Sequence, residues 1–227
     1  GFPKVILVTD RGYESVQNLE RYILRGQPMI MCVKMRQKIV LDKISEFGSI
    51  EGKPGDMLFD AESRLYYKQY DLEYDVRGNG DAVHKSDRMK LDLFFDPYRR
   101  AAEQTDLAVE IEMQRRSLQS ILDASGCVDD DVSIKKNYNW YDVDYDMKDR
   151  RLLSFRLDGK KIANVRKTSG FFGYITLGLD YTALQTLVTY GLRDEQEKYF
   201  CQMKSQMGFA RQRNWSEEGK TGRLLIL

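Results

Sequence analysis

The chain has 227 residues, which is enough to bury one good hydrophobic core, or one core plus a sizeable insertion. Its 36 basic and 35 acidic residues leave a net charge of +1, so the overall charge does not by itself indicate a nucleic-acid-binding protein. A single histidine and three widely spaced cysteines argue against Ser-His-Asp or Cys-His catalysis, zinc sites and a disulfide framework, and leave carboxylates as the working groups of an enzyme.

The first predicted elements form a β-α-β unit. Residues 5–9 are a continuous apolar run ending at Asp10, typical of a buried strand that leads into a turn. Residues 14–24 have apolar side chains at helical spacing, and residues 29–33 read as a second buried strand. Asp10 is then expected at the carboxyl end of the first strand, the edge where open α/β sheets place their sites.

The middle of the chain, about residues 40–165, has a different pattern. Apolar and polar residues alternate over residues 66–76 and 89–95, which predicts a hairpin with a long polar loop at 77–87. We interpret this region as an insertion into the core fold.

A long helix and further strands are expected after the hairpin. Asp96 is a predicted N-cap followed by proline, and the helix is expected to run to residue 124. Strands are predicted at residues 152–157 and 161–165. The aspartates of residues 142–146 hint at a calcium loop, but the required glycine and glutamate are missing, so we expect a solvated acidic loop.

The last part of the chain returns to core-like elements. Residues 171–177 read as a buried strand, and residues 182–207 as a long helix. Leu184, Leu187 and Val188 are expected to pack the first turns of this helix against the sheet.

Four chemically distinct side chains share one face of that helix. Tyr190, Arg193, Glu197 and Lys204 lie at offsets that fall within a stripe about 60° wide and roughly 21 Å long. Such a stripe could hold a metal ion in its middle and a nucleic-acid backbone on both sides. The alternative is a solvated helix face on which Arg193 and Glu197 form an ordinary ion pair at i,i+4.

The spacing of these four residues resembles the Tyr-Arg-Glu-Lys signature of the insertion-sequence-four family of DDE transposases. Residues 5–13, Val-Ile-Leu-Val-Thr-Asp-Arg-Gly-Tyr, look like the second catalytic segment of that family. The two motifs occur in the right order and far apart. The resemblance covers about residues 4–34 and 168–227.

The resemblance implies an α/β fold: an RNase H-like mixed sheet flanked by helices, with a large inserted α+β subdomain. The expected division is a first part of the catalytic core at residues 1–38, the inserted subdomain with its hairpin and long helix at 39–167, and a second part of the core with the signature helix at 168–227.

The resemblance also implies roles for the candidate residues. Asp10 and Glu197 would be the second and third members of an Asp-Asp-Glu triad, binding Mg²⁺ or Mn²⁺ in a two-metal site. Tyr190, Arg193 and Lys204 would hold the transposon end through its phosphates. The first Asp of that family lies on an earlier strand, so we expect this chain to be a fragment that lacks it, with weak or no strand-transfer activity.

The expected function is therefore that of a DNA transposase catalytic-domain fragment, which in the intact protein cleaves and joins DNA phosphodiesters at transposon ends. The expected partner is double-stranded DNA, as transposon ends and target, and the resemblance alone also implies a homodimer. We expect no membrane partner and a bacterial cytoplasmic, nucleoid-associated location. The alternatives are a transposase-derived DNA-binding module without catalysis, and a structural α/β domain in which Asp10 caps a turn or helix.

Residues 148–167 hold eight basic and two acidic residues, which permits a basic surface on a neutral protein.

Overall fold

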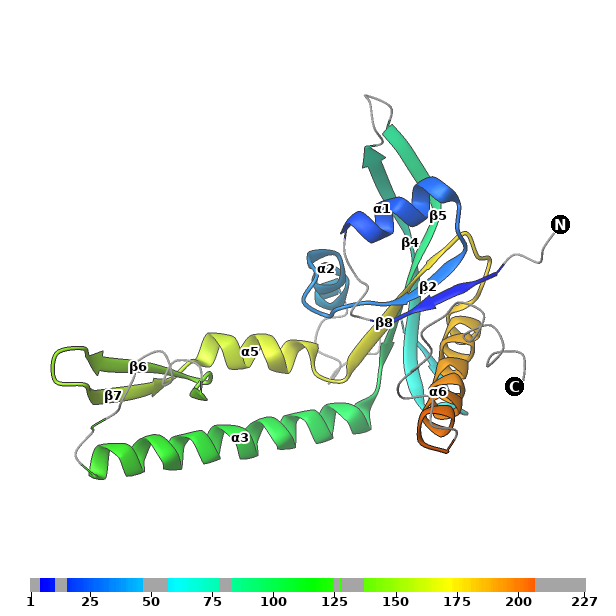
Figure 1. Ribbon diagram of the computed structural model, residues 1–227. Coiled ribbons are helices and arrows are strands. Elements are labelled where there is room, and N and C mark those ends of the chain that lie inside the picture. The colour runs from blue at the N-terminus through cyan, green and yellow to red at the C-terminus, as the bar shows by residue number, and fades with distance from the viewer. Residues whose placement is uncertain are drawn as a thin grey trace, which may run out of the picture.

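The protein is a mixed α/β fold with a mostly antiparallel sheet, flanked by helices, and a long projecting arm (Figure 1). The computed structural model describes residues 5–10, 16–46, 57–77, 83–124, 127 and 137–206. For residues 16–17, 74–77, 83–88, 194–197 and 199–206 it describes the backbone alone.

Six strands form the main sheet. Their spatial order is β1 (Leu7–Thr9), β2 (Met29–Cys32), β8 (Phe171–Leu177), β5 (Val83–Phe95), β4 (Leu65–Arg77) and β3 (Leu58–Asp60). The pair β1–β2 is parallel and is joined by helix α1 (Val16–Arg25), which confirms the predicted β-α-β unit. The remaining pairs are antiparallel. The predicted hairpin is also confirmed, although β5 begins at Val83, within the expected loop, and only residues 78–82 separate the two strands.

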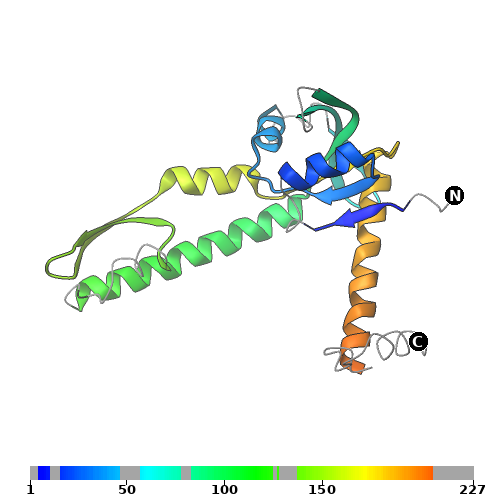
Figure 2. The ribbon, with the colours of Figure 1, turned by 45° about the horizontal axis from the view of Figure 1, so that its top comes forward.

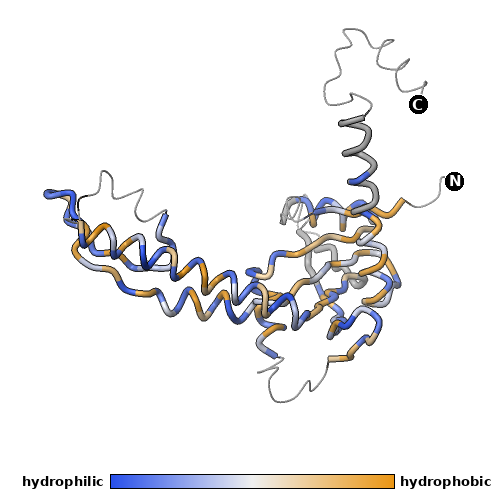
Figure 3. Tube along the Cα trace, turned by 90° about the horizontal axis from the view of Figure 1, so that it is seen from below, coloured by the Kyte–Doolittle hydropathy of each residue, from blue (hydrophilic) through white to orange (hydrophobic). Residues whose placement is uncertain are grey.

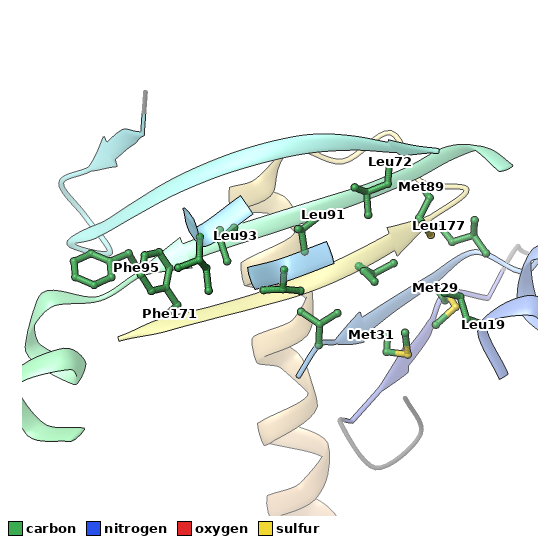
Figure 4. Packing of buried hydrophobic residues seen from close by; sticks show 14 residues of the cluster. Leu19, Met29, Met31, Leu72, Met89, Leu91, Leu93, Phe95, Phe171 and Leu177 are labelled. Carbon is green, nitrogen blue, oxygen red and sulfur yellow. The ribbon is translucent and has the colours of Figure 1, made fainter. Parts of the chain in front are cut away.

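One face of the sheet packs against α1 and α2 (Lys38–Glu46). Alternate residues of the central strands point to this side, as the two-residue period of a strand requires (Figure 4). Strands β2 and β8 are buried on both faces, so their sequences are nearly continuous apolar runs, whereas apolar and polar residues alternate in β4 and β5. The core cluster includes Leu19, Met29, Met31, Val40, Ile44, Leu91, Leu93 and Leu177.

The other face of the sheet packs against α6 (Ala183–Gln206). Ile30, Phe94 and Tyr174 lie under the first turns of this helix, together with Leu184 and Leu187. The expected packing of Leu184 and Leu187 is therefore confirmed. The same expectation is wrong for Val188, which is 66% exposed and lies away from the sheet.

A buried carboxylate links α6 to the sheet. The Gln69 amide on β4 donates to Asp92 Oδ1 on β5 at 2.6 Å, and the same amide donates to the Tyr181 carbonyl before α6 at 2.9 Å. Asp92 is fully buried, and burial raises the pKa of its carboxyl above the ordinary value of 3.8. Hydrogen bonds from Gln69 and Thr186 and the charge of Lys90 oppose that rise.

The arm consists of four elements that leave and rejoin the sheet at neighbouring strand ends. They are α3 (Pro97–Asp123), β6 (Tyr141–Asp146), β7 (Arg151–Leu157) and α5 (Gly159–Thr168). Figure 2 shows α3 and α5 side by side, projecting away from the body that carries α6. In Figure 3 hydrophobic and hydrophilic residues alternate along both helices, and a small core of Leu107, Trp140 and Ile162 joins them.

The start of α3 and the strand β7 agree with their predictions, whereas two other predictions for the arm are wrong. Asp96 caps α3 by accepting from the Tyr98 and Arg99 amides, as expected. Residues 161–165 are part of helix α5 rather than a strand, because Asp158 caps the Lys161 amide and Ile162 and Val165, three residues apart, face the small core. Residues 142–146 form β6 rather than an acidic loop, because their alternation pairs them with β7 while the aspartates lie at the surface.

The expected division into residues 1–38, 39–167 and 168–227 stays a prediction. Within the middle part, β3, β4 and β5 continue the main sheet beyond β8, and the arm lies outside it. In the part of the chain that the structure describes, neither long helix nor any other is apolar enough to span a membrane.

Replacing Gly170 with alanine should destabilise the junction between the arm and the sheet. Gly170 has φ +79°, and an added Cβ would lie 2.6 Å from Arg100 Cβ and 2.8 Å from the Asp96 carbonyl oxygen. We expect a loss of about 2–4 kcal/mol in the free energy of unfolding, measured by urea denaturation. Gly159→Ala is the matched control, since an added Cβ there meets no atom within 4 Å. Equal stability of the two variants would contradict this account.

The buried Asp92 carboxyl should make the fold less stable as pH rises. Because its pKa is raised in the folded protein, the folded state keeps its proton to higher pH than the unfolded state does, and this contribution to stability is lost above the unfolded value of 3.8. Asp92→Asn removes the titration, so its free energy of unfolding relative to the parent should rise between pH 3 and pH 7. The exposed Asp71→Asn on β4 controls for the lost charge; a parallel pH profile for Asp92→Asn and the parent would refute the prediction.

Candidate functional site

Asp10 lies directly after β1, on the side of the sheet that α6 covers. Ile6 and Val8 point to the α6 side, while Leu7 packs on the opposite face. The two-residue period of a strand therefore directs Asp10 toward α6 as well. Its side chain is 59% exposed, so the carboxylate stands at the surface at the carboxyl end of the strand.

Arg193 joins Asp10 to Tyr190. The Arg193 Nη1 donates to the Tyr190 hydroxyl at 2.8 Å and lies 3.3 Å from Asp10 Oδ1. Its guanidinium also stands over the Tyr190 ring, 5.0 Å from the centroid. The structure thus brings Asp10 to Tyr190 and Arg193, which follow it by 180 and 183 residues along the chain.

Tyr190 is held by the sheet beneath it. Its ring packs on Tyr174 of β8 with centroids 4.4 Å apart, and it also interacts with Cys32 of β2. Burial raises the pKa of the Tyr190 phenol to about 12; Cys32 and Asp10 add to the rise and the Arg193 charge opposes it. The phenol is therefore protonated at neutral pH.

Glu197 and Lys204 lie on the same helix, but their side chains are outside the part of the structure that is described. The backbone of α6 runs through both positions. Glu197 follows Arg193 by four residues, which is about one turn or 6 Å along the axis. The helix thus keeps Glu197 on the face that carries Arg193.

The described residues fit only part of a metal site. Among the side chains that the structure describes, no group of three histidine, cysteine or acidic residues is placed to hold an ion. Asp10 is one oxygen ligand of the kind that Mg²⁺ prefers, and it carries a cationic partner in Arg193.

Sequence reasoning missed the residues that support the site. Tyr174 and Cys32 were seen only as parts of buried strands, because alternation shows which residues share a face but not which strands are neighbours. Their adjacent positions follow from the register, in which Cys32 and Tyr174 are direct partners. No local signal in the sequence identifies that pair.

The phenol of Tyr190 should remain protonated where an ordinary tyrosine is half ionised. At pH 10 the difference in tyrosinate absorbance between the parent and Tyr190→Phe should be close to zero, because the pKa of this phenol is about 12 against an ordinary 10.0. Tyr98→Phe is the control, since that side chain is 71% exposed. Loss of about half a tyrosinate signal at pH 10 in Tyr190→Phe would contradict the buried site.

The candidate site joins the end of β1 to α6. It consists of an exposed carboxylate at a strand end, a guanidinium beside it and a protonated phenol below. No protein-family model, curated protein or solved structure matches the chain.

Proposed function

We propose that this chain carries the catalytic domain of a DDE transposase on an RNase H-like core. The observation that carries the proposal is the contact between Asp10 Oδ1 and Arg193 Nη1 at 3.3 Å. Each residue comes from one of the two sequence motifs that resemble the family. A chance match in two unrelated surface segments would not be expected to place them side by side.

The topology around Asp10 supports the same proposal. Asp10 follows a strand of a parallel pair joined by a helix, and α6 crosses the same face of the sheet. Among the described residues β1 pairs only with β2, which leaves its other edge open. A strand that pairs with this edge would place a further carboxylate next to Asp10, as a triad requires.

Asp10 and Glu197 would hold the divalent ions, Mg²⁺ or Mn²⁺, with the first carboxylate supplied from outside the described residues. Bound there, such ions would activate the attacking oxygen and stabilise the leaving oxygen at a DNA phosphodiester. The exposure of Asp10 leaves room for the waters that Mg²⁺ retains.

Arg193, Tyr190 and Lys204 would bind and orient the DNA end. A guanidinium matches the fork geometry of a phosphate, and Arg193 is only 23% exposed, so its position is fixed by its neighbours. Tyr190 remains a hydrogen-bond donor at neutral pH because its pKa is raised to about 12. Its hydroxyl accepts from Arg193 and also hydrogen-bonds with Cys32, so it would hold the guanidinium in place beside a bound phosphate.

One observation favours the second candidate, a DNA-binding module without catalysis. The charge of Asp10 is offset by Arg193, whose Nη1 lies 3.3 Å from Asp10 Oδ1. In that case the stripe of α6 would contact phosphates without a bound metal ion.

Mn²⁺ binding to the full chain distinguishes the two candidates. We expect Asp10→Asn and Glu197→Gln each to weaken Mn²⁺ binding at least about tenfold, measured by electron paramagnetic resonance, because each removes one anionic ligand. Asp149→Asn, an exposed carboxylate of the arm, is the control. Binding that is the same in all three variants would refute the metal site.

The affinity of the Arg193→Gln variant for duplex DNA is the second measurement needed to distinguish the two candidates. If Mn²⁺ binding is unaffected by the substitutions but Arg193→Gln lowers DNA affinity and the salt dependence of binding, the module without catalysis is favoured. If Mn²⁺ binding does not depend on Asp10 or Glu197 and DNA binding does not depend on Arg193, the transposase proposal fails.

A further inference from the structure

A hollow lies at the base of the arm, built from different elements than the Asp10 site. It has a volume of about 690 Å³ and opens between α2, the residues before β6, and α5. Its size is in the range of pockets that take small ligands or single groups of larger ones. The residues that matter to its chemistry are Arg36, Glu110, Trp140, Lys161, Asn164 and Lys167.

The charge of this hollow is positive. Arg36, Lys161 and Lys167 line it, against the single carboxylate of Glu110. Lys161 Nζ donates to the Asn139 carbonyl, and Lys167 Nζ donates to Ser45 Oγ of α2 at 2.7 Å. Both ammonium groups are thus held in place by neutral oxygens. Within the described part of the chain, no carboxylate lies within ion-pair distance of these three cations.

Trp140 is one of the residues that line the hollow, and its side chain is 8% exposed. The Lys161 ammonium stands over the Trp140 ring, 5.5 Å from the centroid. An oxyanion bound in the hollow would therefore meet this ammonium group beside the ring.

A smaller hollow continues this surface toward the sheet. It has a volume of about 520 Å³ and shares Arg36, Val165 and Thr168 with the first. It adds Lys34 and Arg99 to the wall, although Arg99 is paired with Glu103 at 2.7 Å. The positive surface therefore extends over two adjoining hollows rather than one isolated pocket.

We propose that the hollow between α2 and α5 binds a phosphate group of a nucleic-acid backbone, through Arg36, Lys161 and Lys167. This inference rests on the proposed action on DNA, and it assigns the base of the arm as a second contact region, separate from α6. Cations held by neutral partners and without a carboxylate at ion-pair distance suit an oxyanion, and a row of phosphates could occupy both adjoining hollows.

The first test is the affinity of the full chain for a duplex of about 30 base pairs at several salt concentrations. The double variant Arg36→Gln/Lys167→Gln should bind about three- to tenfold more weakly, and the slope of log affinity against log salt should fall by about one unit or more. Lys148→Gln/Lys160→Gln removes the same charge from exposed arm residues that do not line these hollows. Equal losses in the two double variants would overturn the proposal, because they would report net charge alone.

A fluorescence measurement distinguishes nucleic-acid phosphates from a free anion. In Trp215→Phe, Trp140 is the single tryptophan, and duplex DNA should change its emission in the parent background but not in Arg36→Gln/Lys167→Gln. A response to inorganic phosphate or pyrophosphate with none to DNA would overturn the nucleic-acid assignment.

The variants also separate this inference from the proposed function. If Arg193→Gln weakens DNA binding and the Arg36/Lys167 variant binds like its control, the inference at the arm fails while the proposed function stands. If the parent binds no DNA, both fail. If only the Arg36/Lys167 variant weakens DNA binding, the arm is the contact region and the role of α6 is refuted.

Discussion

Tyr174 of β8 and Tyr190 of α6 pack ring against ring, with centroids 4.4 Å apart, and this contact fixes where α6 crosses the sheet. The helix must cover Ile30, Phe94 and Tyr174, because these side chains point away from the face that α1 and α2 bury. Once Tyr190 lies over Tyr174, the next turn of the helix reaches the end of β1. The meeting of Arg193 with Asp10 is thus a consequence of how the sheet is covered.

The Asp92–Gln69 pair also fixes the position of α6 on the sheet, at the residues just before the helix. Gln69 of β4 donates both to the Asp92 carboxyl of β5 and to the backbone just before α6, so the position of the helix is linked to two strands at once. A buried carboxyl is costly unless it is hydrogen-bonded or protonated. Here the Gln69 amide donates to one of its oxygens, and burial raises its pKa.

Local patterns predicted most of the elements, but not their neighbours. The apolar runs before Asp10 and after Gly170, the Asp96 cap and the alternation of the hairpin each depend on a few adjacent residues, and each element is found. The short apolar pattern of residues 161–165 fits either a strand or a helix, and the deciding factor, packing against Leu107 and Trp140, is set by residues distant in the sequence. The same limit applies to β6, because its pairing with β7 decides its structure.

The candidate site also shows that local patterns do not predict which elements are neighbours in space. Helical periodicity placed Tyr190 and Arg193 on one face, and the end of an apolar run singled out Asp10. The contact between them depends on strand order, since β2 and β8 must be neighbours for α6 to lie beside β1. Strand order follows from long-range pairing, which no window of the sequence contains.

The arm departs from the sheet at Phe95 and returns at Phe171, and these two residues are direct partners in the β5–β8 ladder. In topological terms the whole arm is one long loop of a hairpin, whose ends are about 5 Å apart. The β5–β8 pairing therefore does not depend on how long the arm is, although α5 also contacts α2 through Lys167 and Ser45. The geometry around Asp10, in contrast, is built from β1, β2, β8 and α6, without a residue of the arm.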